Sequence, residues 1–461
     1  MKPKVLSIIY LFSLMLLLCS CKANPSTPAE GTVNPAKADD NQANHGLLSI
    51  METEHGYYYN YGYTAFQIEN DQINFISGNR HQLRYYDKES GESILLCNKP
   101  ECEHQGGDSC VATYGNLTVI NSILYNNMIY VYGMEQVENI MRFNLYQVAL
   151  DGSSMDKVGT VFEAENTIGE SATIVPGFLS ARDVTFIIHR GYAYLPYYLR
   201  IGKASKGFMG GGLVQMNLET GKIKTLFQQE YMNSLFPQNL MACGDYVYMD
   251  MRSSNAFKGS MRYVISRDTI EYPPACQEYH PVFHAVTEEQ LYVFSPGYDP
   301  TTGTASDSWV LVTYDGVTAE QLPERQITTD ITGEEIENFR RFFPYKDMMI
   351  IATQQRVVFY GISEENYGQK LGEIVHTYDY KKWFYNNPTL EYHVENDTLY
   401  RITELPATAI YGDTYDSQGA YTLFQVSRCS LADIFRGQGV WTEAFVYEPG
   451  RKTDSAIHLT N

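Results

Sequence analysis

Short runs of alternating apolar and polar residues, rich in tyrosine, recur along the chain from residue 47 onward. Each run follows a turn that contains Gly, Asn or Asp, and an alternation with a period of two residues predicts a β-strand with one buried face. Seven such runs lie at residues 55–58, 126–130, 190–194, 243–248, 289–293, 346–350 and 396–400. Helical patterns are sparse and are confined to residues 334–343 and 431–435. The pattern therefore predicts an all-β chain with two short helices in its loops.

The strand runs form a degraded repeat. One marker per repeat lies at the turn, and the markers are Gly56, Asn127, Gly191, Gly244, Gln290, Asp347 and Asp397. Successive markers are 71, 64, 53, 46, 57 and 50 residues apart. Propeller repeats have periods of roughly 40–50 residues, and insertions in the connecting loops explain the longer steps. Because a four-stranded sheet cannot bury both of its faces alone, we expect such sheets to stack in a ring.

The repeat thus predicts a β-propeller of seven four-stranded antiparallel blades, with six or eight blades as alternatives. Two stacked β-sandwiches are less favoured, because the markers continue without a break in mid-chain. We further expect residues 47–51 and 440–447 to pair within one blade and so close the ring. The tandem Tyr-strands and Asp-Gly turns resemble those of bacterial surface propellers of the broad TolB-like kind, and this resemblance implies the fold alone.

The N-terminal residues have the pattern of an export signal. Two lysines precede the apolar run 5–18, which is short for a transmembrane span but fits a secretory signal. The run ends in Leu18-Cys19-Ser20-Cys21, which resembles the lipobox of bacterial lipoproteins. The resemblance implies cleavage before Cys21 and a diacylglycerol on its sulfur, whereas Cys19 is the weaker candidate because bulky Leu18 precedes it. A plain secretory peptide with two incidental cysteines is the alternative.

These patterns divide the chain into four parts. They are a signal peptide (1–20), a lipidated cysteine with a tether (21–46), a propeller (47–452) and a C-terminal tail (453–461). Residues 22–45 contain three prolines and no aromatic residue, so they cannot bury enough apolar surface to offset their chain entropy. We expect a disordered tether with a mean reach on the order of 25–30 Å. The predicted location is the outer face of a cell membrane, with the lipid as anchor.

Composition excludes one class of function. The 461 residues contain 34 Lys and Arg against 54 Asp and Glu, a net charge of −20. Loss of Lys2 and Lys4 with the signal peptide gives 32 − 54 = −22. A chain this acidic, without a basic cluster, repels phosphate backbones, so we expect no nucleic-acid partner. The acidic pairs Glu334-Glu335 and Glu364-Glu365 are interpreted as solvated loop faces.

One loop contains a candidate metal site, formed by Cys97, Cys102, His104 and Cys110. Three thiols and one imidazole within fourteen residues are the ligand set of a tetrahedral structural zinc. Four protein ligands would close the coordination shell, so the ion would stabilise the loop and not catalyse a reaction.

A disulfide within this loop is the alternative, because exported cysteines normally oxidise. Cys243, Cys276 and Cys429 are isolated in the sequence and are interpreted as buried small apolar residues. With its lipobox, propeller and Cys/His loop, the chain resembles uncharacterised surface lipoproteins of anaerobic Gram-positive bacteria. This resemblance implies no activity.

No local catalytic motif occurs, since G-x-S-x-G, H-E-x-x-H, a P-loop and a Gly-rich dinucleotide turn are all missing. We therefore favour a non-enzymatic propeller that binds a protein partner or an extracellular ligand. The alternative is a carbohydrate-active enzyme or glycan-binding module with its site in the propeller funnel. Candidates for that site are four histidines and three aromatic clusters, although core packing is the preferred interpretation of both: His189, His280, His284, His393, and residues 57–63, 197–198 and 383–387.

Overall fold

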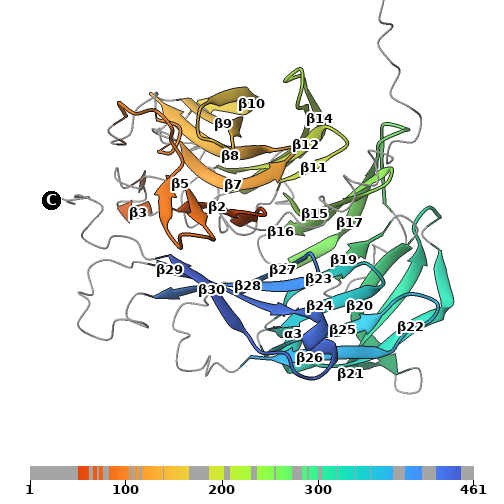
Figure 1. Ribbon diagram of the computed structural model, residues 1–461. Coiled ribbons are helices and arrows are strands. Elements are labelled where there is room, and N and C mark those ends of the chain that lie inside the picture. Colours follow the sequence, from red (N-terminus) through yellow and green to blue (C-terminus); the bar gives the residue numbers. More distant parts are fainter. Residues whose placement is uncertain are drawn as a thin grey trace, which may run out of the picture.

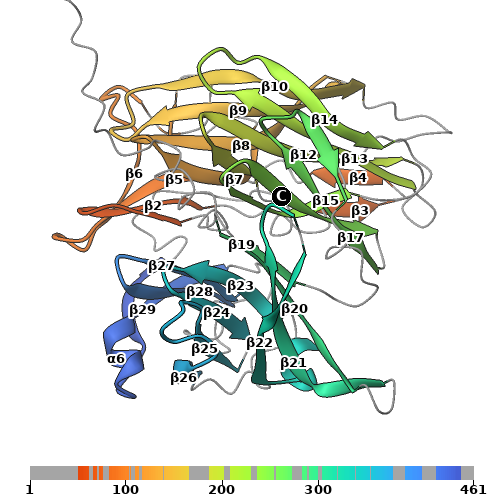
Figure 2. The same ribbon diagram turned by 90° about the vertical axis from the view of Figure 1, so that its right-hand side faces the viewer.

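Seven four-stranded antiparallel sheets follow one another along the chain. In the computed structural model they stand around a common centre, with the first strand of each sheet nearest to it (Figure 1). Figure 2, turned by 90°, shows blades 1 to 3 on one side of the centre and blades 5 to 7 on the other. The predicted β-propeller is therefore confirmed, with seven blades and not six or eight.

The structure describes most of the propeller. The described residues are 50–61, 66–69, 72–75, 82–102, 104, 110–113, 117–138, 140–165, 186–201, 208–229, 236–253, 256–272, 283–287, 290–299, 304–318, 320–337, 339–353, 355–376, 390–406 and 422–447. The expected signal peptide, the lipidated Cys21 with its tether and the C-terminal tail lie outside them. No helix among the described residues is long and apolar enough to span a membrane.

Each blade is one sheet of four strands, and neighbours in the sheet follow one another in chain order. Blade 1 is formed by β1 (Ile50–Glu52), β2 (Gly56–Tyr61), β5 (Gln82–Asp87) and β6 (Ser93–Leu95), and blade 2 by β7 (Thr118–Tyr125), β8 (Met128–Val137), β9 (Ile140–Ala149) and β10 (Met155–Glu165). Blade 3 is formed by β11 (Ile187–His189), β12 (Tyr192–Ile201), β13 (Phe208–Asn217) and β14 (Ile223–Gln229), and blade 4 by β15 (Phe236–Cys243), β16 (Tyr246–Ser253), β17 (Ala256–Val264) and β18 (Thr269–Glu271). A separate hairpin, β3 (Phe66–Glu69) and β4 (Gln72–Phe75), is inserted in blade 1.

Blades 5 to 7 repeat this arrangement. Blade 5 is formed by β19 (Phe283–Val286), β20 (Gln290–Asp299), β21 (Thr304–Asp315) and β22 (Gln321–Thr332). Blade 6 is formed by β23 (Phe339–Tyr345), β24 (Met348–Thr353), β25 (Arg356–Gly361) and β26 (Lys370–Val375). Blade 7 is formed by β27 (Leu390–Glu395), β28 (Thr398–Pro406), β29 (Thr422–Ser430) and β30 (Thr442–Tyr447). Two short helices, α3 (Gly333–Glu337) and α6 (Leu431–Phe435), lie in connections.

The predicted ring closure is wrong. Strand β1 pairs with β2, with Ile50 opposite Tyr59, and β30 pairs with β29, with Tyr447 opposite Phe424. The two ends of the propeller thus belong to different blades, 1 and 7. The reason is that each terminal strand has a hairpin partner nearby in the sequence, which is closed at a lower entropic cost than a pairing across the whole chain.

The helix prediction at 431–435 is confirmed as α6, but the one at 334–343 is wrong beyond residue 337. The residues that follow form β23, the first strand of blade 6. Successive side chains of a strand point to opposite faces. Phe342 accordingly packs in the core shared with blade 5, and Phe343 in the core shared with blade 7.

The core lies between neighbouring blades, and tyrosine fills much of it. Tyr57 and Tyr59 of β2 are 2% and 1% exposed. Tyr197 of blade 3 stacks on Phe162 of blade 2, with ring centroids 4.6 Å apart. Tyr57 and Tyr59 are therefore buried and Tyr197 packs between blades, as the preferred interpretation predicts. Residues 62–63 and 383–387 lie outside the described ones.

The two ends of the ring differ in their connections. The first and second strands of blades 2, 3 and 7 are joined by two-residue turns, Asn126-Asn127, Arg190-Gly191 and Asn396-Asp397, with positive φ at both positions. Such turns have the twist that a tight hairpin needs. Because antiparallel strands alternate in direction, the connections between third and fourth strands lie at the same end, which we call the short-turn end.

The opposite end holds the connections between second and third strands and those between blades. Apart from 96–117, which begins beside the Gly152 turn of blade 2, the longest of these connections are residues 62–81, 166–186, 376–389 and 407–421. We call this the long-connection end. Strand β1 begins here, because the first strand of a blade runs from this end toward its short turn.

Candidate metal centre

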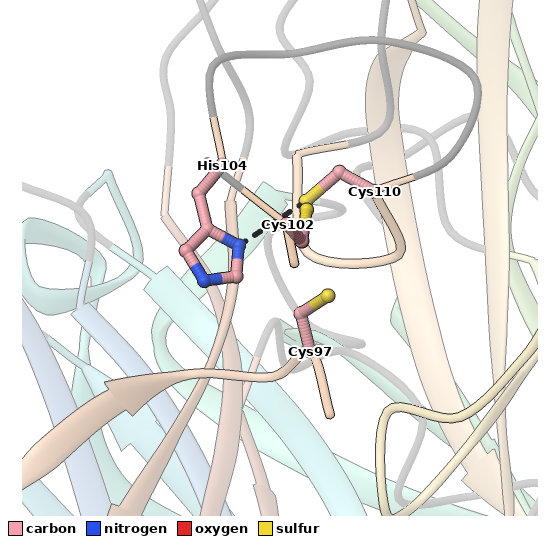
Figure 3. Close-up of side chains that lie close together, drawn as sticks. All are labelled: Cys97, Cys102, His104 and Cys110. Carbon is pink, nitrogen blue, oxygen red and sulfur yellow. Dashed lines mark hydrogen bonds between the residues drawn. The ribbon is translucent and has the colours of Figure 1, made fainter. Parts of the chain in front are cut away.

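Four potential metal ligands converge in the connection between blades 1 and 2. One ligand atom from each of Cys97, Cys102, His104 and Cys110 lies within 4.8 Å of all the others. Figure 3 shows the three thiols and the imidazole close together around a common point. Cys110 is buried, whereas the other three residues are partly exposed. The structure thus brings together every ligand that the sequence predicts for this site.

Strand β6 and one tight turn position Cys97 and Cys102. Leu96 extends the edge of blade 1, because its N–H donates to a carbonyl of β5 at 2.9 Å and its side chain is buried. The Cys102 N–H then donates to the Lys99 carbonyl at 3.1 Å. This closes a four-residue turn with Pro100 at its second position, where the fixed φ of proline is favoured.

His104 and Cys110 are positioned by the left-handed backbone at His104 and by a second hydrogen bond to β5, just after Cys110. His104 has a φ of 55°, and its Nδ1 lies 3.5 Å from the Cys110 sulfur. After Cys110 the chain returns to blade 1, where the Leu83 N–H donates to the Ala112 carbonyl at 2.7 Å. Val111 and Ala112 are buried there. The loop is therefore tied to blade 1 at both of its ends.

The surroundings favour the thiolate, the form that binds a metal, at Cys110 and disfavour it at Cys102. Burial raises the pKa of Cys110, but the nearby Thr113 and His104 side chains outweigh it and lower the pKa to about 7. At Cys102 the His104 N–H lowers the pKa, but burial and the neighbouring sulfurs outweigh it, so that the pKa is raised. A divalent cation would relieve this crowding of sulfurs.

Cys97, Cys102, Cys110 and Cys429 have free thiols. A tetrahedral zinc has Zn–S distances of about 2.3 Å, which separates its sulfur ligands by about 4 Å. The cluster has spacings of this order, and it could hold a metal such as zinc. Cys243 and Cys429 are buried, as expected for isolated cysteines. Cys276 lies outside the described residues.

The loop also contacts blade 2. Gly152, in the turn between β9 and β10, has a φ of 69°, and its carbonyl accepts the Asn98 N–H at 3.3 Å. A Cβ at this position would lie 2.8 Å from the Leu96 carbonyl oxygen and 2.9 Å from the Cys97 nitrogen. The turn between β9 and β10 thus needs glycine at position 152, because only glycine lets it lie so close to the backbone of Leu96 and Cys97.

Replacement of Gly152 by alanine is expected to destabilise the junction of blades 1 and 2. The left-handed backbone alone costs about 1 kcal/mol with a Cβ, and the contacts with Leu96 and Cys97 should add about 1–3 kcal/mol. Gly191→Ala is the matched control, because Gly191 has a φ of 76° and no atom within 4 Å of a Cβ. Denaturant unfolding measures both variants, and equal losses would show that the close approach is unimportant.

Of the histidines considered for the funnel, His189 and His393 have described side chains. His189 is fully buried, and its Nε2 donates to the Gly244 carbonyl at 2.8 Å. His393 is buried and stacks on Tyr400 with ring centroids 4.7 Å apart. Both are core residues. His280 lies outside the described residues, and for His284 only the backbone, in β19, is described.

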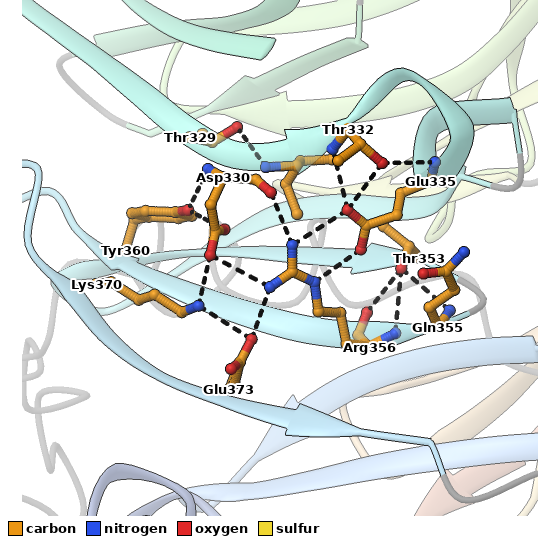
Figure 4. Close-up of polar contacts among 11 residues, drawn as sticks. Thr329, Asp330, Thr332, Glu335, Thr353, Gln355, Arg356, Tyr360, Lys370 and Glu373 are labelled. Carbon is orange, nitrogen blue, oxygen red and sulfur yellow. Dashed lines mark hydrogen bonds and ion pairs between the residues drawn. The ribbon is translucent and has the colours of Figure 1, made fainter. Parts of the chain in front are cut away.

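A polar cluster at the junction of blades 5 and 6 was not predicted from the sequence (Figure 4). Arg356 of β25 contacts Glu335 of α3 at 2.7 Å, Asp330 of β22 at 3.2 Å and Glu373 of β26 at 2.7 Å. Lys370 adds contacts with two of these carboxylates. Glu335 is only 4% exposed, so its interpretation as a solvated loop residue is wrong, whereas Glu334 is exposed. The buried charge of Glu335 is tolerated because the Arg356 guanidinium faces it.

Comparison with known proteins identifies no family for this chain. No protein-family model matches the chain, and no curated protein matches it. Among solved structures, oligopeptidase B from Leishmania major matches with a TM-score of 0.47 and 8% identity, over 90% of this chain and 51% of that one. This chain thus spans about half of the oligopeptidase.

Two smaller proteins are matched over nearly their whole length. Hsv2 from Kluyvelomyces marxianus has a TM-score of 0.40 and 7% identity, over 84% of this chain and 98% of that one. An oligogalacturonate lyase in complex with manganese has a TM-score of 0.39 and 9% identity, over 79% and 99%. The class of this chain, a seven-bladed β-propeller, follows from the order of its own strands.

Proposed function

We propose that the chain is a lipid-anchored protein of the bacterial cell surface whose propeller binds a protein partner or an extracellular ligand. In this proposal Cys21 holds the lipid, and a zinc ion bound by the Cys/His cluster stabilises the junction of blades 1 and 2. The zinc would have four protein ligands and no open position, so its role is structural.

The difference between the two ends of the ring supports binding. Rigid strands hold the ends of the loops in place, and binding residues of proteins lie disproportionately on such loops. Four of the longest connections join strand ends at one end of the ring, whereas the other end has two-residue turns in several blades. The long-connection end is therefore the proposed binding face.

The glycan alternative is weakened by the packing of the aromatic residues. Rings that stack on a sugar have to be exposed, but Tyr57, Tyr59 and Tyr197 are buried. Purified chain incubated with a panel of polysaccharides tests this alternative, because release of oligosaccharides would favour an enzyme. Stoichiometric binding of a purified envelope protein, with no turnover, would favour the binding proposal.

Lipidation is tested with two cysteine variants. Metabolic labelling with an alkyne fatty acid is expected to label the native chain and Cys19→Ala, and not Cys21→Ala, because the acylated residue follows the cleavage site. Detergent phase partition should shift only Cys21→Ala to the aqueous phase. Label that persists in Cys21→Ala and is lost in Cys19→Ala would show that Cys19 is the lipidated residue. No label in any of the three chains would refute the lipid anchor.

A further inference from the structure

Within the described propeller, the polypeptide crosses every junction between neighbouring blades except one. A connection leads from the fourth strand of each blade to the first strand of the next, beginning with residues 96–117 and ending with residues 376–389. Blades 7 and 1 hold the two ends of this propeller, because β30 pairs within blade 7 and β1 within blade 1. Among the described strands, these two blades therefore meet without a shared strand and without a connection between them.

The connections at the crossed junctions themselves form bonds between blades. In the connection from blade 1 to blade 2, the Asn98 N–H donates to the Gly152 carbonyl at 3.3 Å. In the connection from blade 6 to blade 7, the His376 Nε2 lies 2.6 Å from the Tyr392 hydroxyl oxygen. Because such bonds have to break before the blades separate, opening of a crossed junction costs more than the parting of two packed faces.

Blades 7 and 1 meet through the side chains of two buried faces. Successive side chains of a strand point to opposite faces. Tyr58 of β2 packs in the core shared with blade 2, so Tyr57 and Tyr59 face blade 7. Cys429 of β29 packs in the core shared with blade 6, so Val426 faces blade 1. Tyr57, Tyr59 and Val426 are all buried, and the ring is therefore closed here by packing.

We infer that the ring opens at the junction of blades 7 and 1 while its crossed junctions stay closed. Local openings of native proteins range in free energy from about zero to the global value, so the junction with the fewest ties opens first. Strands β1 and β27 lie nearest to the centre in their blades (Figure 1). An opening between these strands connects the centre of the ring with its side. It requires neither the proposed lipid anchor nor a bound ligand.

Three valine-to-cysteine variants of the full chain measure the opening. Val426 lies on the third strand of blade 7, and Val357 and Val358 lie on the third strand of blade 6. All three are buried, but only Val426 faces blade 1, whereas Val357 faces blade 7 and Val358 faces blade 5. Each variant is treated with iodoacetamide under native conditions. Peptide mass spectrometry gives the labelling rate of the new cysteine, which is divided by its rate in the unfolded chain.

Labelling at position 426 should be about tenfold or more faster than at positions 357 and 358, because only position 426 lies at the junction that opens locally. Its rate should also depend weakly on urea, since a local opening exposes less surface than global unfolding. Equal rates at the three positions, or a rate at 426 that rises with urea as steeply as global unfolding, would overturn the inference.

Cys429 is an internal control in the Val426→Cys chain. It lies on the same strand, is buried and faces blade 6. Trypsin cleaves after Arg428, so positions 426 and 429 are read from separate peptides of one molecule. Cys429 should stay unlabelled while position 426 reacts. Equal labelling of both would show that blade 7 unfolds or detaches as a whole, which contradicts an opening on one side only.

A second pair of variants makes the result independent of the folding of one chain. Tyr400 follows Leu399, which packs toward blade 6, so Tyr400 faces blade 1, whereas Tyr392 faces blade 6. Both tyrosines are buried. Tyr400→Cys should be labelled faster than Tyr392→Cys by a similar factor. Equal or slower labelling at position 400 would refute the opening, whatever the valine variants show.

Discussion

Replacement of Arg356 by methionine is expected to lower the free energy of unfolding by about 3–5 kcal/mol, the usual cost of removing one partner of a buried ion pair. Its guanidinium donates to both oxygens of Glu335, at 2.7 and 3.1 Å. The Glu335 side chain is 5% exposed, so its charge would remain buried without its cation. Urea unfolding at pH 7 measures the loss.

Two further variants separate this explanation from a general packing defect. Lys370→Met, in the same cluster but 33% exposed, should cost less than about 1 kcal/mol, because water replaces a partly exposed partner. The double variant Arg356→Met, Glu335→Gln should recover much of the loss, since the buried residue 335 then carries no charge. A double variant as unstable as the single one would show that lost packing, and not the charge, is responsible.

The acid dependence of stability provides an independent measurement on this cluster. Burial raises the pKa of Asp330, but hydrogen bonds from Lys370 and Tyr360 and the charge of Arg356 outweigh it and lower the pKa to about 2. A lowered pKa contributes stability above the unfolded value, 3.8, and this contribution is lost as the pH falls toward 2. Arg356→Met should therefore show a weaker fall in stability between pH 4 and pH 2 than the native chain.

Removal of the metal is expected to cause the second large loss of stability. The purified full chain is expected to contain one zinc per molecule, and at a free zinc concentration about 1,000-fold above the Kd the ion stabilises the fold by about 4 kcal/mol. A strong chelator should remove that contribution and lower Tm. Emission spectrometry of the metal, together with thiol titration before and after chelation, measures the occupancy. A native chain with no metal and fewer free thiols than cysteines would favour the disulfide.

Matched serine variants locate the effect in the cluster. Cys110→Ser should abolish zinc binding and remove the response of Tm to the chelator. Cys243→Ser is the control, because Cys243 is buried as well and lies in blade 4, outside the cluster. It should lose stability through its own packing and still respond to the chelator. If both variants respond equally, the metal is bound elsewhere.

The blades and the metal ligands could be predicted because both depend on residues close together in the sequence. Each blade is a meander of neighbouring strands, so the alternation of residues and the turn signals suffice to predict it. The four ligands fall within residues 97–110, and a loop of this length brings them together with few long-range contacts. The seven markers accordingly correspond to the seven blades.

The errors arise where a residue acts through a distant partner. The helix predicted at 334–343 ignores that Phe342 and Phe343 fill cores on opposite sides of blade 6. Glu335 has the character of a surface residue until Arg356, on the next blade, is placed against it. No pattern within either segment contains this information, because tertiary packing overrides local propensity.

The sequence by itself determined the fold class and the candidate ligand set, and it favoured seven blades over six or eight, because strand pairing and loop closure here are local. Only the tertiary structure decided which blades hold the two ends, which charges are buried and which end of the ring has the long connections. These properties depend on how the blades are placed around the axis. Contacts between residues far apart in the sequence specify that placement, and their partners cannot be identified from local patterns.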